Sequence, residues 1–215
     1  MNKFLGILML IFSFSCQSKE KGVVYSKIKE SNTMNLQKDT EIAIFAGGCF
    51  WCTEAVFLEL KGVKHVASGY IGGTIENPTY EMICTGTTGH AEAILIEFDP
   101  KIVSFETLLE LFFATHDPTT LNRQGNDVGT QYRSEIFYQN TTQKDVAEAY
   151  IAQMTQAKTF TQPIVTKVTA TSKFYEAEDY HQNYYNQNKS QGYCHYVITP
   201  KIEKVRKSFK DKLKE

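Results

Sequence analysis

The sequence of 215 residues has almost no net charge, because 23 Lys and Arg side chains are balanced by 24 Asp and Glu side chains. Without an excess of one sign, no surface is expected that would favour nucleic acid or another strongly charged partner. The sequence also lacks an internal repeat, so residues 41–215 are expected to form a single domain. Hydrophobic residues make up 42% of the chain and aromatic residues 13%, which is enough to build the core of a globular protein.

The first sixteen residues differ from the rest of the chain. Lys3 is followed by an almost wholly apolar run at 4–14, which is too short to span a bilayer as a permanent helix. A run of this kind that ends at a cysteine resembles a bacterial lipoprotein signal. Residues 1–15 would then be removed, and Cys16 would become the lipidated first residue of the mature chain. The alternative is an ordinary cleaved signal peptide in which Cys16 is incidental.

Residues 16–40 are polar and poor in aromatic side chains. Such a segment cannot bury enough apolar surface to offset the entropy lost on ordering it. We interpret it as a flexible tether between a lipid anchor in the membrane and the folded domain, although residues 23–28 could lie along the surface of that domain. This interpretation predicts a lipoprotein of the bacterial cell envelope that faces the periplasm or the cell surface.

Beyond the tether, segments typical of strands and of helices are mixed. Apolar or β-branched segments bounded by turn residues predict strands at 42–45, 93–98, 134–138 and 163–171. Apolar side chains at helical spacing predict helices at 49–60, 105–113 and 146–154. The mixed order predicts an α/β domain of the α+β sandwich type, with a mixed central sheet flanked by helices and an extended C-terminal segment.

The last fifteen residues contain seven basic and three acidic side chains. Ile202, Val205, Phe209 and Leu213 form a narrow apolar stripe at helical spacing within this segment. A basic amphipathic helix beside a lipid anchor would bind anionic lipid headgroups. A narrow stripe also suits docking against the domain, and we favour docking.

The segment 47–52, Gly-Gly-Cys-Phe-Trp-Cys, is the chemical centre of the sequence. A cysteine that follows a strand and two glycines lies at the first turn of the next helix, where unpaired amides and the helix dipole stabilise a thiolate. This position favours Cys49 as a nucleophile over a passive core residue. Phe50 and Trp51 supply an apolar wall beside its sulfur.

Cys49 and Cys52 also form a Cys-x-x-Cys pair, which leaves other interpretations open. Such a pair is typical of thioredoxin-like disulfide exchangers. It can also contribute to a zinc site, but no second cysteine pair and no well-spaced histidine pair completes one, so no metal is expected. In an exported protein, the two cysteines together with Cys84 and Cys194 could instead form two structural disulfides.

Two further polar clusters carry candidate side chains. Residues 86–92 end in Glu92 at the mouth of an apolar strand, where a carboxylate would be desolvated and would hold its proton more tightly. Residues 124–134 combine glycines with short polar side chains and predict a loop, the kind of segment on which site residues are displayed. Taken alone, these clusters are more often a solvated acid and an ordinary loop.

Several motifs together resemble the peptide methionine sulfoxide reductase A family, in the family's order and spacing. The motifs are Gly-Cys-Phe-Trp at 48–51, Asn-Pro-Thr-Tyr at 77–80, Gly-His-Ala-Glu at 89–92, Gly-Asn-Asp-Val-Gly-Thr-Gln-Tyr-Arg-Ser at 125–134 and Ala-Glu-Asp-Tyr-His-Gln at 177–182. The resemblance implies an enzyme that reduces methionine-S-sulfoxide, free or within proteins, to methionine. It argues against a disulfide exchanger and against a structural protein, because neither needs these motifs together.

The resemblance also implies roles for the residues around the first cysteine. Cys49 matches the nucleophile that attacks the sulfoxide sulfur, and Phe50 and Trp51 match the pocket for the substrate methyl group. Glu92 matches the acid that gives a proton to the sulfoxide oxygen, which requires a carboxyl group that is neutral near neutral pH.

Other polar residues are matched in the same way. Tyr80 and Tyr132 match phenols that hydrogen-bond the sulfoxide oxygen, and Asp127 matches a polar residue of the same pocket. His90 and His181 lie inside the motifs and are expected only to support the site through hydrogen bonds. The resemblance implies no bound cofactor, but an external thioredoxin-like reductant.

Attack and loss of methionine would leave a sulfenic acid on Cys49, which a second thiol must convert to a disulfide. Cys194, in the segment Gly-Tyr-Cys-His, resembles the resolving cysteine of many family members. Cys52 replaces the glycine that many members carry after the Trp, and it is the competing resolver. The sequence favours Cys194, and Cys84 is interpreted as a spectator.

Overall fold

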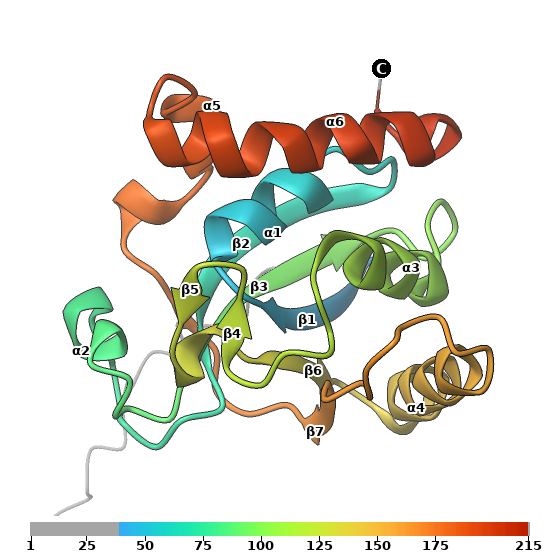
Figure 1. Ribbon diagram of the computed structural model, residues 1–215, viewed down its shortest axis with the longest axis horizontal. Coiled ribbons are helices and arrows are strands. Elements are labelled where there is room, and N and C mark those ends of the chain that lie inside the picture. Colours follow the sequence, from blue (N-terminus) through green and yellow to red (C-terminus); the bar gives the residue numbers. More distant parts are fainter. Residues whose placement is uncertain (1–38, 215) are drawn as a thin grey trace, which may run out of the picture. The chain divides into compact units, whose positions relative to one another are not determined.

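A six-stranded sheet in the order β7-β6-β1-β3-β2-β8 is the centre of the computed structural model, which describes residues 39–214 (Figure 1). The strands are β1 (Glu41–Gly47), β2 (Val63–Ile71), β3 (Ala91–Phe98), β6 (Ser134–Tyr138), β7 (Lys167–Ala170) and β8 (Tyr175–Glu176). Neighbouring strands are antiparallel except β6 and β7, so the sheet is mixed. The predicted signal peptide at 1–15, Cys16 and nearly all of the tether at 16–40 lie outside the described residues.

Alternation along β3 separates the two faces of the sheet. Ile94 and Ile96 join the main core beneath the helices, whereas Ala93 and Leu95 join a smaller apolar cluster on the opposite face. Glu92 has the same parity as Ile94 and Ile96, so the register of β3 turns its carboxylate toward the helices. A shift of one residue in that register would turn it away.

Within the described chain, the longer helices pack on the same face of the sheet as Ile94 and Ile96 and share one core with it. They are α1 (Phe50–Phe57), α3 (Phe105–Thr115), α4 (Thr141–Gln156) and α6 (Thr199–Ser208). Phe45 of β1 packs against the rings of Phe57, Phe105 and Phe112 with centroid separations of 4.9 to 5.8 Å. Each such aromatic pair adds about 1 kcal/mol to the stabilisation gained from burial.

A sharp turn joins β1 to α1 and delivers Cys49 to the start of the helix. Gly48 has a φ of +90°, a conformation that L side chains rarely adopt. A Cβ atom at Gly48 would also lie 2.4 Å from Cγ of Gln124, so the space is closed to any side chain. The backbone can therefore leave the sheet and start the helix within two residues only because glycine is present.

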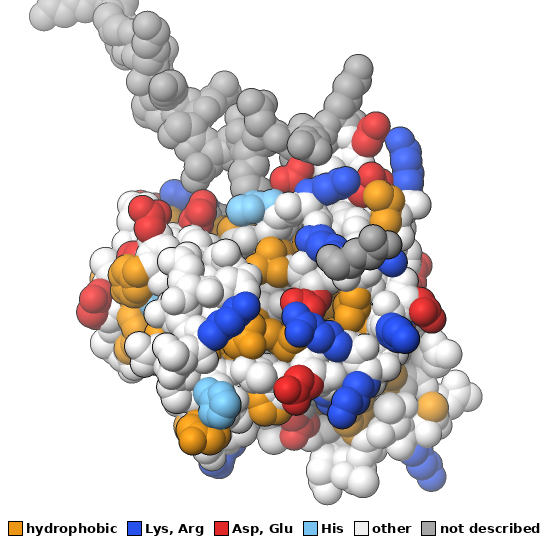
Figure 2. Space-filling model, turned by 90° about the horizontal axis from the view of Figure 1, so that it is seen from above, with side chains coloured by type: hydrophobic (Ala, Val, Ile, Leu, Met, Phe, Trp, Pro, Cys, Tyr) orange, Lys and Arg blue, Asp and Glu red, His pale blue; other side chains and the backbone are white. Residues whose placement is uncertain are grey.

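The C-terminal segment returns to cover α1. A π-helical turn at Cys194–Ile198 runs directly into α6, which packs against α1 (Figure 1). Ile202, Val205 and Phe209 are all buried, so the apolar stripe docks on the domain as favoured from the sequence. Viewed from above this helix, the surface carries several basic side chains with apolar ones between them (Figure 2).

The predicted fold class, a mixed sheet flanked by helices with an extended C-terminal segment, is confirmed. The strand predicted at 134–138 has those bounds, and Ser104 caps α3 by accepting a hydrogen bond from the Thr107 amide. The helix predicted at 49–60 is shorter, since α1 ends at Phe57. Strand β2 was not predicted. Within residues 39–214, no helix combines the length and the apolar character needed to cross a membrane.

Candidate active site

Cys49 lies at the edge of a small pocket of about 190 Å3. The residue is the N-cap of α1 and is 9% exposed. The pocket is lined by Cys49, Phe50, Trp51, Tyr80, Glu92, Asp127, Tyr132 and Tyr193. It therefore brings together every catalytic and substrate-binding residue predicted from the sequence except Cys52 and Cys194, and it adds Tyr193.

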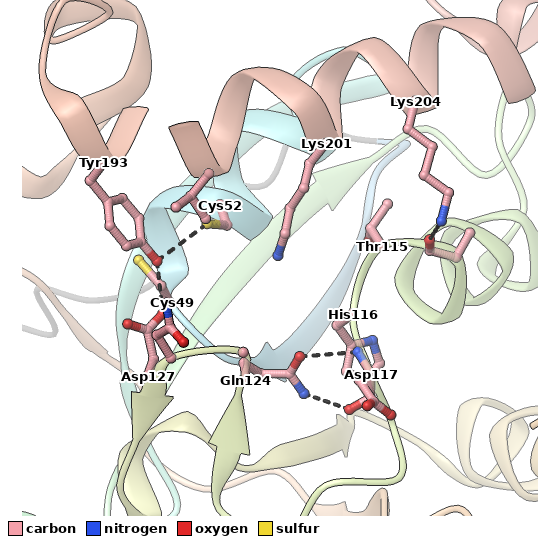
Figure 3. A pocket seen from close by; sticks show the side chains of 14 residues that line it. Cys49, Cys52, Thr115, His116, Asp117, Gln124, Asp127, Tyr193, Lys201 and Lys204 are labelled. Carbon is pink, nitrogen blue, oxygen red and sulfur yellow. Dashed lines mark hydrogen bonds between the residues drawn. The ribbon is translucent and has the colours of Figure 1, made fainter. Parts of the chain in front are cut away.

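A larger cleft of about 680 Å3 shares Cys49, Asp127 and Tyr193 with the pocket (Figure 3). Cys52 lines this cleft but not the pocket. The remaining lining side chains are mostly polar or charged, and Lys201 reaches into the cleft from α6 (Figure 3). The two cysteines of the Cys-x-x-Cys pair thus open toward different spaces, and Cys49 borders both.

Stacked aromatic rings form the wall of the pocket. The Trp51 indole lies 3.7 Å from the Tyr184 ring at an interplanar angle of 6°, and its Nε1–H donates to Nδ1 of His181 at 3.0 Å. The Phe50 ring stacks on Tyr80 with centroids 6.5 Å apart. Such a wall can receive a small apolar group beside the sulfur of Cys49.

Glu54 supports this wall from inside α1. Its side chain is 1% exposed, and its two carboxylate oxygens accept hydrogen bonds from the backbone amides of Asn183 at 2.8 Å and Tyr184 at 3.2 Å. Burial raises the pKa of Glu54 to about 7, although these hydrogen bonds oppose the rise. Because Tyr184 stacks on Trp51, the carboxyl group of Glu54 fixes the outer layer of the pocket.

Glu92 lies beneath the first turn of α1. It is 2% exposed, and its Oε2 accepts a hydrogen bond from the Phe50 amide at 3.1 Å. Burial is the main cause that raises the pKa of Glu92 to about 8, and the charges of Asp127 and Cys52 act in the same direction. The carboxyl group is therefore mostly neutral at neutral pH and can act as a proton donor, as expected from the sequence.

Tyr80 and Tyr132 also retain their protons. Burial raises the pKa of each hydroxyl, and the charge of Glu92 adds to the rise. The Tyr80 amide donates to Glu178 at 2.9 Å, and the same carboxylate accepts the Tyr70 hydroxyl at 2.8 Å. The two phenols are hydrogen-bond donors on a pocket that also contains a neutral acid.

Tyr193 links the pocket to the cleft. Its hydroxyl donates to Oδ2 of Asp127 at 2.8 Å and lies 3.7 Å from Sγ of Cys52 (Figure 3). Burial raises the pKa of Tyr193, so this hydroxyl remains a donor. Asp127 is thereby held in place by a residue 66 positions later in the chain.

The pKa values of the two neighbouring thiols are shifted in opposite directions. Burial raises the pKa of Cys49 well above its ordinary value, and the adjacent Cys52 and Glu92 add to the rise. The hydrogen bond from the Cys49 thiol lowers the pKa of Cys52 to about 7 against the effect of burial, and the charge of Lys201 assists. Burial thus opposes the effect of the helix N-terminus on Cys49, whose side chain accepts no capping hydrogen bond, and an ionised Cys49 stays a prediction.

The cysteines of residues 39–214 are all free thiols, and two of them stand apart from the pocket. Cys194 is completely buried in the π-helical turn, and it lines neither the pocket nor the cleft. Cys84 is exposed at the end of α2 (Tyr80–Cys84). The geometry therefore brings Cys52, but not Cys194, into contact with Cys49.

Two buried histidines of the described chain, His90 and His116, serve the framework. His90 accepts a hydrogen bond from the Gly73 amide at 3.1 Å and donates to the Ile75 carbonyl at 2.8 Å, which holds the loop before β3. Burial lowers the pKa of His116 to about 4, so it is neutral. No group of three or more His, Cys, Asp and Glu side chains suited to a metal ion is present in residues 39–214.

Sequence reasoning missed four residues of the site. Tyr184 follows the motif at 177–182, but nothing in the sequence distinguishes it as a ring that packs on Trp51. Tyr193 directly precedes Cys194, and no pattern separates it from the other tyrosines of the chain. Glu54 had a recognisable signal, an acidic residue amid the apolar side chains of a short helix. Lys201 had none, because surface lysines are common in the last fifteen residues.

A nucleophilic thiol and a neutral carboxylic acid that share one aromatic pocket, with a second thiol in contact, are what thiol-based redox catalysis requires. We therefore place the protein among the thiol-dependent oxidoreductases.

Comparison with known proteins narrows this class. Residues 41–213 match the family model described as peptide methionine sulfoxide reductase, and the chain belongs to that family. The peptide methionine sulfoxide reductase MsrA of Deinococcus radiodurans is 54% identical over 191 residues, which cover 88% of this chain and 93% of that protein. The MsrA of Chromobacterium violaceum is 54% identical over 169 residues, which cover 79% of this chain and 96% of that protein. This protein is accordingly an oxidoreductase with methionine sulfoxide reductase A activity.

Solved structures agree with the fold. Reduced Mxr1 from Saccharomyces cerevisiae matches with a TM-score of 0.67 and 31% identity, covering 73% of this chain and 90% of that chain. Methionine sulfoxide reductase A of Corynebacterium diphtheriae matches with a TM-score of 0.65 and 36% identity, covering 74% of this chain and 80% of that chain.

The substitution Glu54→Ala is expected to loosen the aromatic wall. It leaves two buried amides without their acceptor, which costs on the order of 2 kcal/mol of unfolding free energy. Trp51 is the only tryptophan of the sequence, so a red shift of its fluorescence in the folded variant reports the loss of stacking on Tyr184. Glu76→Ala, at an exposed loop position, is the control and should leave the emission unchanged. Identical emission spectra for the wild type and Glu54→Ala would contradict the role of Glu54.

Proposed function

We propose that the protein reduces methionine-S-sulfoxide, free or within proteins, through a sulfenic acid on Cys49 and an intramolecular disulfide. Substrate binding, oxygen transfer and disulfide formation each depend on particular residues of the pocket and the cleft. The observation that carries it is the neutral acid Glu92 in the same 190 Å3 pocket as the Cys49 thiol and the aromatic wall.

Substrate binding follows from the lining of the pocket. The methyl group of the sulfoxide packs against Phe50 and Trp51, and the sulfoxide oxygen accepts hydrogen bonds from Tyr80 and Tyr132. Glu92 gives its proton to that oxygen, which becomes a better leaving group as the S–O bond weakens. Asp127 keeps the Tyr193 hydroxyl in position between the pocket and the cleft.

The first half-reaction transfers the oxygen to Cys49. Its thiol passes its proton to the Cys52 thiolate along their hydrogen bond, and its sulfur attacks the substrate sulfur. This attack forms an S–S bond, and the protonated oxygen then passes from the substrate sulfur to the Cys49 sulfur as its old S–O bond breaks. Methionine leaves with the electron pair of the broken S–S bond, and Cys49 carries the oxygen as a sulfenic acid. Glu92 is left as a carboxylate and Cys52 as a thiol, so protons and charge balance.

The second half-reaction forms a disulfide and water. The sulfur of Cys52 attacks the sulfenic sulfur, the S–O bond breaks, and the hydroxide leaves as water with the proton of Cys52. Contact with Cys49 supports Cys52 as the first resolving thiol, whereas Cys194, favoured by the sequence, is completely buried and would need the C-terminal segment to move. An external thioredoxin-like dithiol then reduces the disulfide, and no bound cofactor takes part.

An assay with separate sulfoxide epimers and a thioredoxin-coupled reductant tests this scheme. Wild-type protein should turn over the S epimer only, and Cys49→Ser should form no methionine even in a single turnover. Cys52→Ser should release about one methionine per chain and then stop, because its sulfenic acid is not resolved. Cys194→Ser should keep cycling. If Cys194→Ser stops after one turnover and Cys52→Ser cycles, Cys194 is the resolver.

The acid role of Glu92 predicts how the rate depends on pH. Its pKa is raised to about 8, so the proton donor is present below pH 8 and is lost as the pH rises through that value. The single-turnover rate should fall across this range. Glu92→Gln keeps an acceptor for the Phe50 amide but has no proton to give, and should be slower by about 100- to 10,000-fold. A variant as fast as wild type would exclude Glu92 as the proton donor.

We also propose that the mature chain is a cell-envelope lipoprotein that begins at Cys16 and carries the catalytic domain on a tether over residues 16–40. The support is the apolar run that ends at Cys16. Expressed in a bacterium that processes lipoproteins, the protein should fractionate with membranes, and Cys16→Ser should not. Mass spectrometry that finds an unlipidated mature N-terminus at another residue would exclude the anchor.

A further inference from the structure

Lys201 is the one charged side chain of the cleft for which no ion pair or hydrogen bond is found within residues 39–214. Lys204, one turn later on α6, lines the same cleft but donates to the Ala114 carbonyl at 3.0 Å. Farther along the segment, Arg206 and Lys212 pair with glutamates. The free ammonium of Lys201 is therefore not part of the helix's surface charge network.

The side chain of Lys201 reaches from α6 into the cleft on the side where Cys52 opens (Figure 3). Its neighbours on the helix, Ile202 and Val205, are buried and fix the rotation of α6 about its axis. That rotation leaves Lys201 half-buried and directed inward. A half-buried cation interacts with a neighbouring charge more strongly than a fully solvated one.

Several titratable or charged groups face Cys52 from the elements packed around it. They are Cys49 of α1, Glu92 of β3, Asp127 of β5 (Asp127–Val128), Tyr193 and Cys194 before α6, and Lys201 of α6. Glu92 is mostly neutral, and Asp127 accepts the Tyr193 hydroxyl. Lys201 is the only cation in this set, so it adds a charge interaction to the hydrogen bonds from Cys49 and Tyr193 that favour a Cys52 thiolate.

We propose that Lys201 is a positioning residue for the disulfide-forming step, whose ammonium group stabilises the thiolate of Cys52 across the cleft. This inference rests on the proposed function, in which Cys52 takes the proton of Cys49 and then attacks the sulfenic acid. Lys201 also stabilises the Cys52 thiolate that is released when the disulfide is reduced. A donor thiolate that attacks Cys49 breaks the S–S bond and sends the electron pair to Cys52, and a thiol of low pKa leaves faster.

The test compares wild type, Lys201→Gln, Lys201→Arg and Lys204→Gln. Reduced protein is mixed with excess methionine-S-sulfoxide without reductant, quenched at intervals and alkylated, so that methionine release and the Cys49–Cys52 disulfide are measured separately across pH. In wild type, the rate of disulfide formation should rise with a midpoint near the pKa of Cys52, about 7. Lys201→Gln should move this midpoint upward by about 0.5 to 1 pH unit, which slows the step about two- to fivefold at pH 7.

Ultraviolet thiolate absorbance of the reduced protein, taken as the difference from Cys52→Ser, gives a second readout without substrate. It should show the same upward shift for Lys201→Gln, a position close to wild type for Lys201→Arg, and no shift for Lys204→Gln. A purely structural role would lower stability without moving either profile. Equal midpoints for wild type and Lys201→Gln, or an equal shift in Lys204→Gln, would overturn the inference. Failure of wild type to release methionine would instead reject the proposed function, and this inference with it.

Discussion

The hydrogen bond from the Phe50 amide to the Glu92 carboxyl group, 3.1 Å long, is the contact on which the organisation of the site depends. It joins the first residue of α1 to the second residue of β3 and fixes an acid beside Cys49. Because the pKa of Glu92 is about 8, the helix N-terminus holds a proton donor at neutral pH.

The surroundings of the two thiols shift their pKa values in opposite directions, upward for Cys49 and downward for Cys52. Burial opposes an anion on Cys49, and a hydrogen bond from Tyr193 offsets this only in part, whereas Cys52 lines the larger cleft, shares hydrogen bonds with Cys49 and Tyr193, and lies in the field of Lys201. This difference in pKa between the two thiols has a chemical advantage, because the fraction of a cysteine that is thiolate governs how readily it is oxidised. A protonated Cys49 is less exposed to adventitious oxidation until a sulfoxide brings its own oxygen to Glu92.

Much of the fold and most of the pocket could be predicted from the sequence, and the exceptions have physical reasons. Strands with continuous apolar runs such as 42–45 were recognisable, but β2 contains Ser68 and Gly69, which have low strand propensity and are tolerated because the strand lies between β3 and β8. The raised pKa of Cys49 could not be predicted, since the helix rule takes no account of burial. How deeply this thiol is buried depends on segments far apart in the chain, a long-range property. Lys201 was out of reach for the same reason, because its inward direction follows from the docking of α6.

The residues that carry the chemistry lie at the start of α1, whereas residues that hold them in place lie near the C-terminus. The reason for this long separation along the chain is the shortness of α1. This helix has only eight residues, seven of them buried, and a helix of that length is not stable alone. It is held by the sheet below and by the C-terminal segment above, through the contacts of Glu54 with the amides at 183–184 and of Trp51 with Tyr184. Cys49, Phe50, Trp51 and Cys52 all lie in or next to its first turn. The C-terminal segment therefore supports the chemistry by fixing the orientation of this turn, which explains why residues so late in the chain pack around a nucleophile that comes directly after the first strand.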